Sequence, residues 1–188
     1  MGYDIEALMA ILQSRLKPVR WQHSLEVARM AVQLARHYGE DVELAEVAGL
    51  LHDYAKDLNK EELLAIAEQQ ELFTDLVEMK LPGLLHAPVG AWLIQQDLQI
   101  YDQRILNAVW RHTMGAIDMS PLDQIIFLAD MIEPGRNYPQ QERLYALAFQ
   151  NLDQAMLQAL DSTIQYCLER RQLLHPRTIY VRNYYLTK

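Results

Sequence analysis

Apolar residues recur along this chain with the spacing of amphipathic helices, and no segment alternates between apolar and polar residues as a half-buried strand would. The predicted helices cover residues 4–16, 20–38, 42–55, 60–70, 73–79, 86–97, 102–111, 120–132, 140–149 and 152–171. Residues 175–188 are expected to be irregular or to form a short helix. The pattern predicts an all-α protein built as a helical bundle.

Residues that favour helix ends stand where these boundaries fall. Gly39 can end one helix, and Asn59 with Glu62 three residues later resembles a capping box at the start of another. Ser120 followed by Pro121 is typical of a capping residue with proline in the first turn. No repeat, low-complexity segment or long linker interrupts the pattern, so residues 1–188 are predicted to form a single domain.

Composition narrows the class of protein. No apolar run approaches the ~18 residues that suggest a membrane span, and the first residues lack the features of a secretory signal. The single cysteine, Cys167, excludes an internal disulfide and fits a reducing compartment, so a cytoplasmic location is expected. The 17 Lys and Arg against 25 Asp and Glu give a net charge of -8. We therefore expect no nucleic-acid partner and no membrane association.

Six residues with metal-binding side chains are spread over the predicted helices. They are His23, the adjacent pair His52 and Asp53, His86, His112 and Asp130. Imidazole and carboxylate groups are ligands for iron, manganese or zinc. All of them except Asp53 fall on stripes of apolar residues, which the helical period turns toward the core.

Burial of so many polar groups requires an explanation. A single histidine on an apolar face is more often a hydrogen-bonded core residue than a ligand. Four inward histidines on separate helices, together with Asp130 in an apolar run, instead favour a metal site, because an unpaired buried carboxylate is costly. His86 begins its helix, a position that could leave it half exposed. Six N and O ligands exceed one tetrahedral site and suit a carboxylate-bridged pair of metals.

Several motifs surround these residues. They are Arg20-Trp-Gln-His23, Gly49-Leu-Leu-His-Asp-Tyr-Ala-Lys56, Leu85-His86-Ala-Pro-Val-Gly-Ala91, His112-Thr-Met-Gly115, Ala129-Asp-Met-Ile-Glu-Pro-Gly-Arg136 and His175-Pro-Arg-Thr-Ile179. With them the chain resembles the HD-domain superfamily of metal-dependent phosphohydrolases, and more closely its YqeK-type bacterial members, which hydrolyse diadenosine tetraphosphate symmetrically. The resemblance implies one HD domain with a metal-binding core at about residues 18–136. Residues 140–188 would pack on that core.

The resemblance also implies a dinuclear centre, with iron expected and manganese or zinc as alternatives. The first metal would be held by His23, His52, Asp53 and Asp130. Asp53 would also bridge to a second metal, which His86 and His112 complete. A hydroxide bridging the metals would attack phosphorus and cleave the central anhydride, giving two ADP molecules.

A polyphosphate substrate needs further positive charge. Lys56 lies one turn after His52 and can reach a phosphate oxygen, although a lysine at a helix end also favours the helix dipole. The predicted substrate-binding residues are Arg20, Lys56, His86, His112, Arg136 and Arg177. The predicted catalytic residues are Asp53, Lys56, His86 and His112.

The expected activity is symmetrical hydrolysis of bis(5'-nucleosyl) tetraphosphates. Three alternatives remain open: a nucleotidase or nucleoside triphosphate hydrolase on the same scaffold, a diiron oxygenase, and a metal-containing nucleotide-binding regulator with negligible turnover. The expected partners are small nucleotides, namely diadenosine tetraphosphate and ADP. A homodimer is also considered, although no sequence pattern marks its interface.

Overall fold

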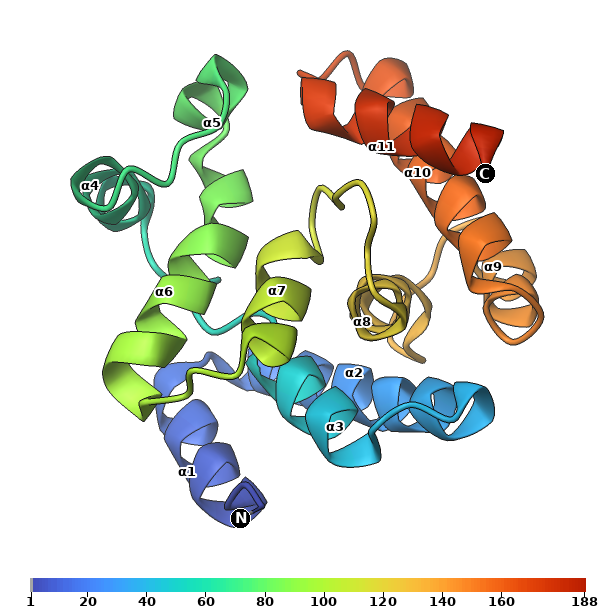
Figure 1. Cartoon of the computed structure of the whole chain (residues 1–188). Coiled ribbons are helices and arrows are strands. Elements are labelled where there is room, and N and C mark those ends of the chain that lie inside the picture. The colour runs from blue at the N-terminus through green and yellow to red at the C-terminus, as the bar shows by residue number, and fades with distance from the viewer. Residues whose placement is uncertain (1) are drawn as a thin grey trace.

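The computed structural model describes residues 2–188, which form helices joined by short connections and contain no strand (Figure 1). The elements of the first part are α1 (Ile5–Arg15), α2 (Pro18–Tyr38), α3 (Val42–Leu51), α4 (Lys60–Gln69), α5 (Leu76–Lys80), the 3-10 helix η1 (Pro82–Leu85), α6 (His86–Leu98), α7 (Gln103–Arg111) and α8 (Pro121–Ile132). The C-terminal part adds α9 (Gln141–Ala148), α10 (Leu152–Glu169) and α11 (Pro176–Thr187). The predicted all-α helical bundle is confirmed. Within residues 2–188, none of the helices has both the length and the apolar character needed to cross a membrane.

The helix predicted over residues 42–55 is shorter than expected. It ends at Leu51, and the chain then tightens into turns, in which the N–H of Tyr54 donates to the carbonyl oxygen of Leu51 at 3.0 Å. His52 and Asp53 are both buried in the turn. Two predicted ligands thus lie in the interior, in the turn directly after α3.

The C-terminal segment is more regular than expected. Residues 176–187 form the helix α11, which His175 caps by accepting the N–H of Arg177 on its Nδ1 atom at 3.1 Å. Pro176 occupies the first turn, where its missing N–H costs nothing. A histidine cap of this kind explains why a motif that reads as irregular begins a helix.

The helices that carry the predicted ligands pack around one another. Helices α2 and α3 lie side by side, and α7 and α8 pack against both α3 and each other (Figure 1). Helix α6 covers α7 on one side, and α10 covers α8 on the other, with α11 packed on α10. The main apolar core runs through these helices, and a smaller apolar cluster lies beneath α4. This packing brings the ends of α3 and α8 toward the N-terminal part of α2, where Arg20 and His23 lie, with the end of α7 close by.

Gly49 lies where α3 approaches α2 most closely. A Cβ atom at this position would stand 2.7 Å from the Cα atom of Ala28. Because a backbone atom cannot move aside cheaply, we expect Gly49→Ala to lower the free energy of unfolding by about 1–3 kcal/mol, measured by urea denaturation. Gly83→Ala is the matched control, since a Cβ there has no neighbour within 4 Å among the described residues. Equal stability of the two variants would contradict the close approach.

Candidate metal centre

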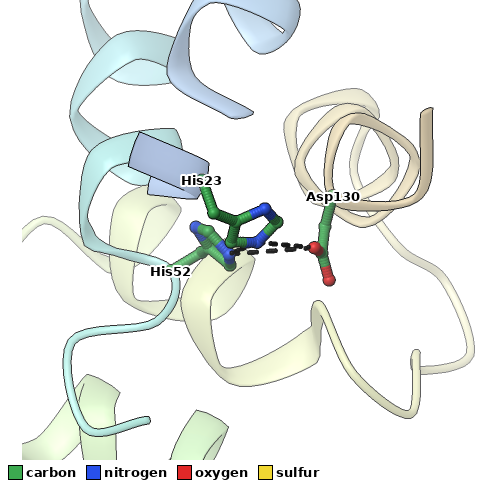
Figure 2. A group of neighbouring side chains, drawn as sticks. All are labelled: His23, His52 and Asp130. Atoms are coloured by element: carbon green, nitrogen blue, oxygen red, sulfur yellow. Dashed lines mark hydrogen bonds and ion pairs between the residues drawn. The ribbon is translucent and has the colours of Figure 1, made fainter. Parts of the chain in front are cut away.

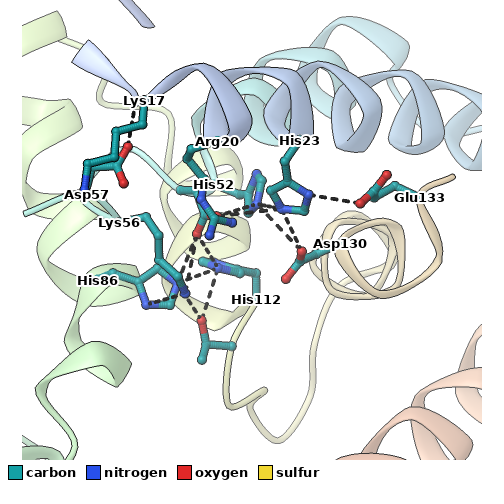
Figure 3. A network of polar contacts seen from close by, with 12 residues as sticks. Lys17, Arg20, His23, His52, Lys56, Asp57, His86, His112, Asp130 and Glu133 are labelled. Atoms are coloured by element: carbon teal, nitrogen blue, oxygen red, sulfur yellow. Dashed lines mark hydrogen bonds and ion pairs between the residues drawn. The ribbon is translucent and has the colours of Figure 1, made fainter. Parts of the chain in front are cut away.

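All six predicted ligands meet inside the bundle, and Figure 3 labels each of them except Asp53. They come from different elements: His23 from α2, His52 and Asp53 from the turn after α3, His86 from the start of α6, His112 from the end of α7, and Asp130 from α8. Four of them are at most 3% exposed: His52, Asp53, His86 and His112. His86 is thus buried rather than half exposed, because α6 packs against α7 and η1 there.

The backbone orients three of the histidines. Their Nδ1 atoms lie near the carbonyl oxygen three residues earlier: His52 at 2.8 Å from Gly49, His86 at 2.5 Å from Gly83, and His112 at 2.6 Å from Val109. A carbonyl oxygen can only accept, so Nδ1 carries the proton in each ring. The Nε2 lone pairs are therefore free to bind a metal, the arrangement in which outer partners commonly hold metal-ligating histidines.

Glu133 orients the fourth histidine. Its Oε1 atom lies 3.2 Å from Nδ1 of His23, and it is only 3% exposed (Figure 3). A carboxylate fixes the proton on Nδ1 as a carbonyl does. No role for Glu133 follows from the sequence alone, although it lies three residues after Asp130 and thus on the same side of the chain near the end of α8.

Neutralising Glu133 is expected to weaken the centre without removing a ligand. We expect Glu133→Gln to lower metal affinity or activity by about 10–100-fold, the range for outer partners of metal ligands. Competition with a chelator measures the affinity. Glu26→Gln is the matched control, because Glu26 lies on α2, the helix that carries His23, but accepts hydrogen bonds from Gln22 and Arg29. An unchanged affinity in Glu133→Gln would show that Glu133 does not hold His23.

Three acceptor atoms converge on one side of the centre (Figure 2). Nε2 of His23 lies 3.2 Å from Nε2 of His52 and 3.0 Å from Oδ1 of Asp130. These three ligand atoms lie within 4.8 Å of one another. Lone pairs that face each other at such distances repel unless a cation or a proton lies between them. The chemistry of this donor set fits a metal ion.

Asp53 stands between two pairs of histidines. Its Oδ2 atom lies 3.4 Å from Nε2 of His52 and 3.7 Å from Nε2 of His23. Its Oδ1 atom lies 3.2 Å from Nε2 of His86 and 3.7 Å from Nε2 of His112. Among the described residues Oδ1 has no hydrogen-bond partner, although it is buried. One carboxylate with an oxygen toward each pair is the arrangement that a bridging ligand requires.

The charge states suit metal binding. Burial raises the pKa of Asp53, but the imidazoles of His52, His112 and His86 outweigh it and hold the pKa well below its ordinary value. Burial, followed by the charge of Lys56, lowers the pKa of His86 to about 4. Near neutral pH the carboxylate is therefore ionised and this imidazole is neutral, which are the forms that bind a metal.

Three of the predicted cationic residues lie at the centre. Nη1 of Arg20 donates to Oδ2 of Asp53 at 2.6 Å, and Arg136 is paired with Asp130. Nζ of Lys56 lies 3.1 Å from Nε2 of His86 and 3.9 Å from Oδ1 of Asp53. Burial lowers the pKa of Lys56, while the nearby carboxylate of Asp53 acts in the opposite direction. The cations thus stand beside the carboxylates that would hold metal.

A hollow of about 270 Å³ opens over the centre. Lys56 and Arg136 lie on its wall beside His86 and His112. Thr113 also lines the hollow, and no role for this residue follows from the sequence alone. Oγ1 of Thr113 lies 3.2 Å from Nε2 of His86 and 3.1 Å from Nε2 of His112. The hollow joins cations to the predicted metal ligands, and this combination of groups suits an anion.

Arg177 does not join this group. It lies at the start of α11 and lines a separate hollow of about 490 Å³ with Trp110, Arg111 and Tyr180. The structure therefore brings nine of the ten predicted site residues together: His23, His52, Asp53, His86, His112, Asp130, Arg20, Lys56 and Arg136. The part that Arg177 takes in substrate binding remains a prediction.

Comparisons with known proteins agree with this geometry. The sequence model of the HD domain matches residues 20–135. A Bacillus subtilis protein named "Bis(5'-nucleosyl)-tetraphosphatase, symmetrical" is 35% identical over 179 residues, covering 95% of this chain and 96% of that protein. A protein of the same name from Halalkalibacterium halodurans is 35% identical over 175 residues, covering 93% of each.

A solved structure shares the whole fold. It is the crystal structure of a Clostridium acetobutylicum protein described as a "predicted HD superfamily hydrolase involved in NAD metabolism", with a TM-score of 0.94 and 35% sequence identity. The similarity covers 100% of this chain and 99% of that one. Motifs, ligand geometry and both kinds of similarity lead to the same assignment: the chain belongs to the HD-domain family.

Proposed function

We propose that this protein is a metal-dependent hydrolase that cleaves bis(5'-nucleosyl) tetraphosphates, and diadenosine tetraphosphate in particular, into two nucleoside diphosphates. The observation that carries the proposal is the position of Asp53: each of its two carboxylate oxygens faces a pair of histidine Nε2 atoms. Support comes from relatives that are named for this symmetrical activity and match over nearly their whole length. The adjacent hollow, with Lys56 and Arg136 on its wall, fits a phosphate chain.

The donor set fits two metal ions. His23, His52, Asp130 and one oxygen of Asp53 would hold one, and His86, His112 and the other oxygen of Asp53 would hold the second. When bound, two such ions supply Lewis-acid charge to the phosphoryl group and activate water. Four imidazoles and two carboxylates accept iron, manganese or zinc, and we propose iron, as the family resemblance implies. Elemental analysis of the purified protein decides among them.

The chain's own cations would bind and orient the substrate. Lys56 and Arg136 both line the hollow above the ligands, so a phosphate chain placed there would meet two positive charges. Arg20 neutralises the buried carboxylate of Asp53 from the side of α2. The hydroxyl group of Thr113 can donate to a phosphate oxygen that approaches His86 and His112.

Removing the charge of Lys56 is expected to impair substrate binding more than metal binding. We expect Lys56→Gln to lower kcat/KM for diadenosine tetraphosphate by roughly 10–100-fold, the effect of losing one hydrogen bond to a charged group. Metal content should stay unchanged. Lys17→Gln is the matched control, because Lys17 is exposed and meets Asp57 through its backbone N–H. Loss of metal together with activity in Lys56→Gln would contradict a role in phosphate binding.

Product analysis tests the activity itself. Purified protein is incubated with diadenosine tetraphosphate without oxygen, metal content is measured on the same sample, and the products are separated. Two metals per chain with ADP as sole product would support the proposal. Inorganic phosphate released from mononucleotides would favour a nucleotidase instead, and tight ADP binding without turnover would favour a nucleotide-binding regulator. Strict dependence on oxygen without phosphate chemistry would favour an oxygenase.

The proposed partners follow from the same site. Diadenosine tetraphosphate and ADP are small anionic nucleotides, whereas the net charge of -8 disfavours binding to a nucleic acid. A homodimer and a cytoplasmic location remain predictions. Native mass measurement tests the first, and fractionation of cells tests the second.

A further inference from the structure

A second hollow adjoins the one over the metal centre. It has a volume of about 470 Å³ and lies between the end of α8, the segment after it, and the C-terminal half of α10. Met131, Tyr138 and Thr163 line both hollows. Because they share these walls, a ligand can extend from one into the other without leaving the protein surface.

The two hollows differ in charge. The hollow over the metal centre is bordered by Lys56 and Arg136 as well as by the histidines. The lining of the second hollow contains no lysine or arginine among the described residues, and its charged side chain is that of Glu169. A phosphate therefore suits the first hollow, whereas an uncharged group suits the second.

The side chains of the second hollow suit a heterocyclic base and a sugar. Tyr166 offers an aromatic ring, and the guanidinium of Arg170 lies 4.6 Å from the centroid of that ring. Ser162 and Thr163 lie about one turn before Tyr166 on α10; each hydroxyl group donates to the carbonyl oxygen four residues earlier, and its oxygen can still accept a hydrogen bond. Aromatic rings bind bases by stacking on their faces, and hydroxyl groups pair with their polar edges.

We propose that the second hollow binds the nucleoside of one half of the dinucleotide, while the phosphates of that half extend over the metal centre. The inference rests on the proposed function for the identity of the substrate. It also gives a physical reason for symmetrical cleavage. A nucleoside bound beside the centre places its own phosphates at a set distance from the metal ligands. The spacing between the hollows would therefore determine which phosphoanhydride bond is hydrolysed.

Tyr138 stands at the junction of the two hollows. Its hydroxyl group is buried and has no hydrogen-bond partner among residues 2–188. Burial raises the pKa of Tyr138 to about 12, so the hydroxyl group keeps its proton near neutral pH. A buried donor without a partner is costly. A ribose or phosphate oxygen that passes the junction would accept this hydrogen bond.

Binding measurements distinguish the contribution of the nucleoside to affinity from that of the phosphates. ADP and inorganic pyrophosphate are each titrated into the metal-loaded protein by calorimetry. We expect Tyr166→Ala to weaken ADP binding about tenfold, the effect of losing one stacked base, and to leave pyrophosphate binding unchanged. Ser162→Phe, which fills the hollow, should have the same selective effect. Tyr101→Ala is the matched control, because Tyr101 is 59% exposed, comparable to Tyr166 at 48%, and does not line the second hollow.

Two outcomes would overturn the assignment. One is an unchanged affinity for ADP in both Tyr166→Ala and Ser162→Phe, or an equal loss of ADP and pyrophosphate. The other is a selective loss of ADP binding in Arg177→Ala alone, which would place the nucleoside in the hollow beside α11. Because these measurements need no turnover, they are independent of activity. Selective ADP binding by a protein that does not cleave diadenosine tetraphosphate would refute the proposed function but keep the nucleoside site.

Discussion

Asp53→Asn is expected to lose both bound metal and turnover, with kcat/KM for diadenosine tetraphosphate lowered by more than about 100-fold, beyond the range for outer partners of a metal ligand. Asparagine keeps the shape of the side chain but removes the negative charge that faces four imidazoles. Because each oxygen of Asp53 serves a different pair of histidines, one substitution should disturb both halves of the centre. Steady-state kinetics and elemental analysis measure the effect, and circular dichroism should show an unchanged helical content.

Asp57→Asn is the matched control for this variant. Asp57 lies four residues further on and accepts the backbone N–H of Lys17 at 2.8 Å, outside the centre (Figure 3). Asp57→Asn should therefore keep its metal and most of its activity. If Asp53→Asn retained metal and turnover like the control, the assignment of Asp53 as a bridge would be wrong.

Removal of metal is expected to destabilise the fold. Six imidazole and carboxylate groups converge in the interior, and without a cation their lone pairs face one another. Metal at about 1,000 times its Kd should raise the free energy of unfolding by about 4 kcal/mol. For a chain of this length the Tm should then rise by roughly 8–16 °C. Thermal unfolding with and without a chelator measures the difference, which should shrink as the pH falls, because protonated imidazoles do not bind metal.

Two histidine variants test whether this stabilisation comes from the centre. His52→Ala should abolish the difference in Tm between the metal-loaded and the chelated protein. His37→Ala should preserve it, because His37 packs edge-on against Tyr38 and Phe149, away from the ligands. Loss of metal in His37→Ala would mean that the ligands have been assigned incorrectly.

The ligands could be predicted from the sequence because their inward orientation is a local property. The 3.6-residue period places His23, His112 and Asp130 on the apolar stripes of their own helices, and any packing of those stripes buries them. Cap residues are local in the same way, as the capping boxes of α4 and α8 show. The family resemblance then supplied the division of the ligands between two metals, which periodicity does not address.

Other residues of the site could not be predicted because their roles depend on neighbours far along the chain. Glu133 acts on His23 across 110 positions, and its polarity alone says nothing of that contact. Tyr138 and Thr163 share a wall only because α10 folds back over the end of α8. Arg177 is predicted from the sequence to bind substrate, but the packing of α11 places it in a different hollow.

The pattern of residue types thus determines the helices, their inward faces and the chemical nature of the ligands, since each depends on spacings within a few turns. Packing of distant helices determines the rest. It buries His52 and Asp53 in the turn that follows α3, and it directs each oxygen of Asp53 to its own histidine pair. These contacts join segments that lie tens of residues apart in the sequence. Their distances are determined by how the apolar faces of the helices pack against one another.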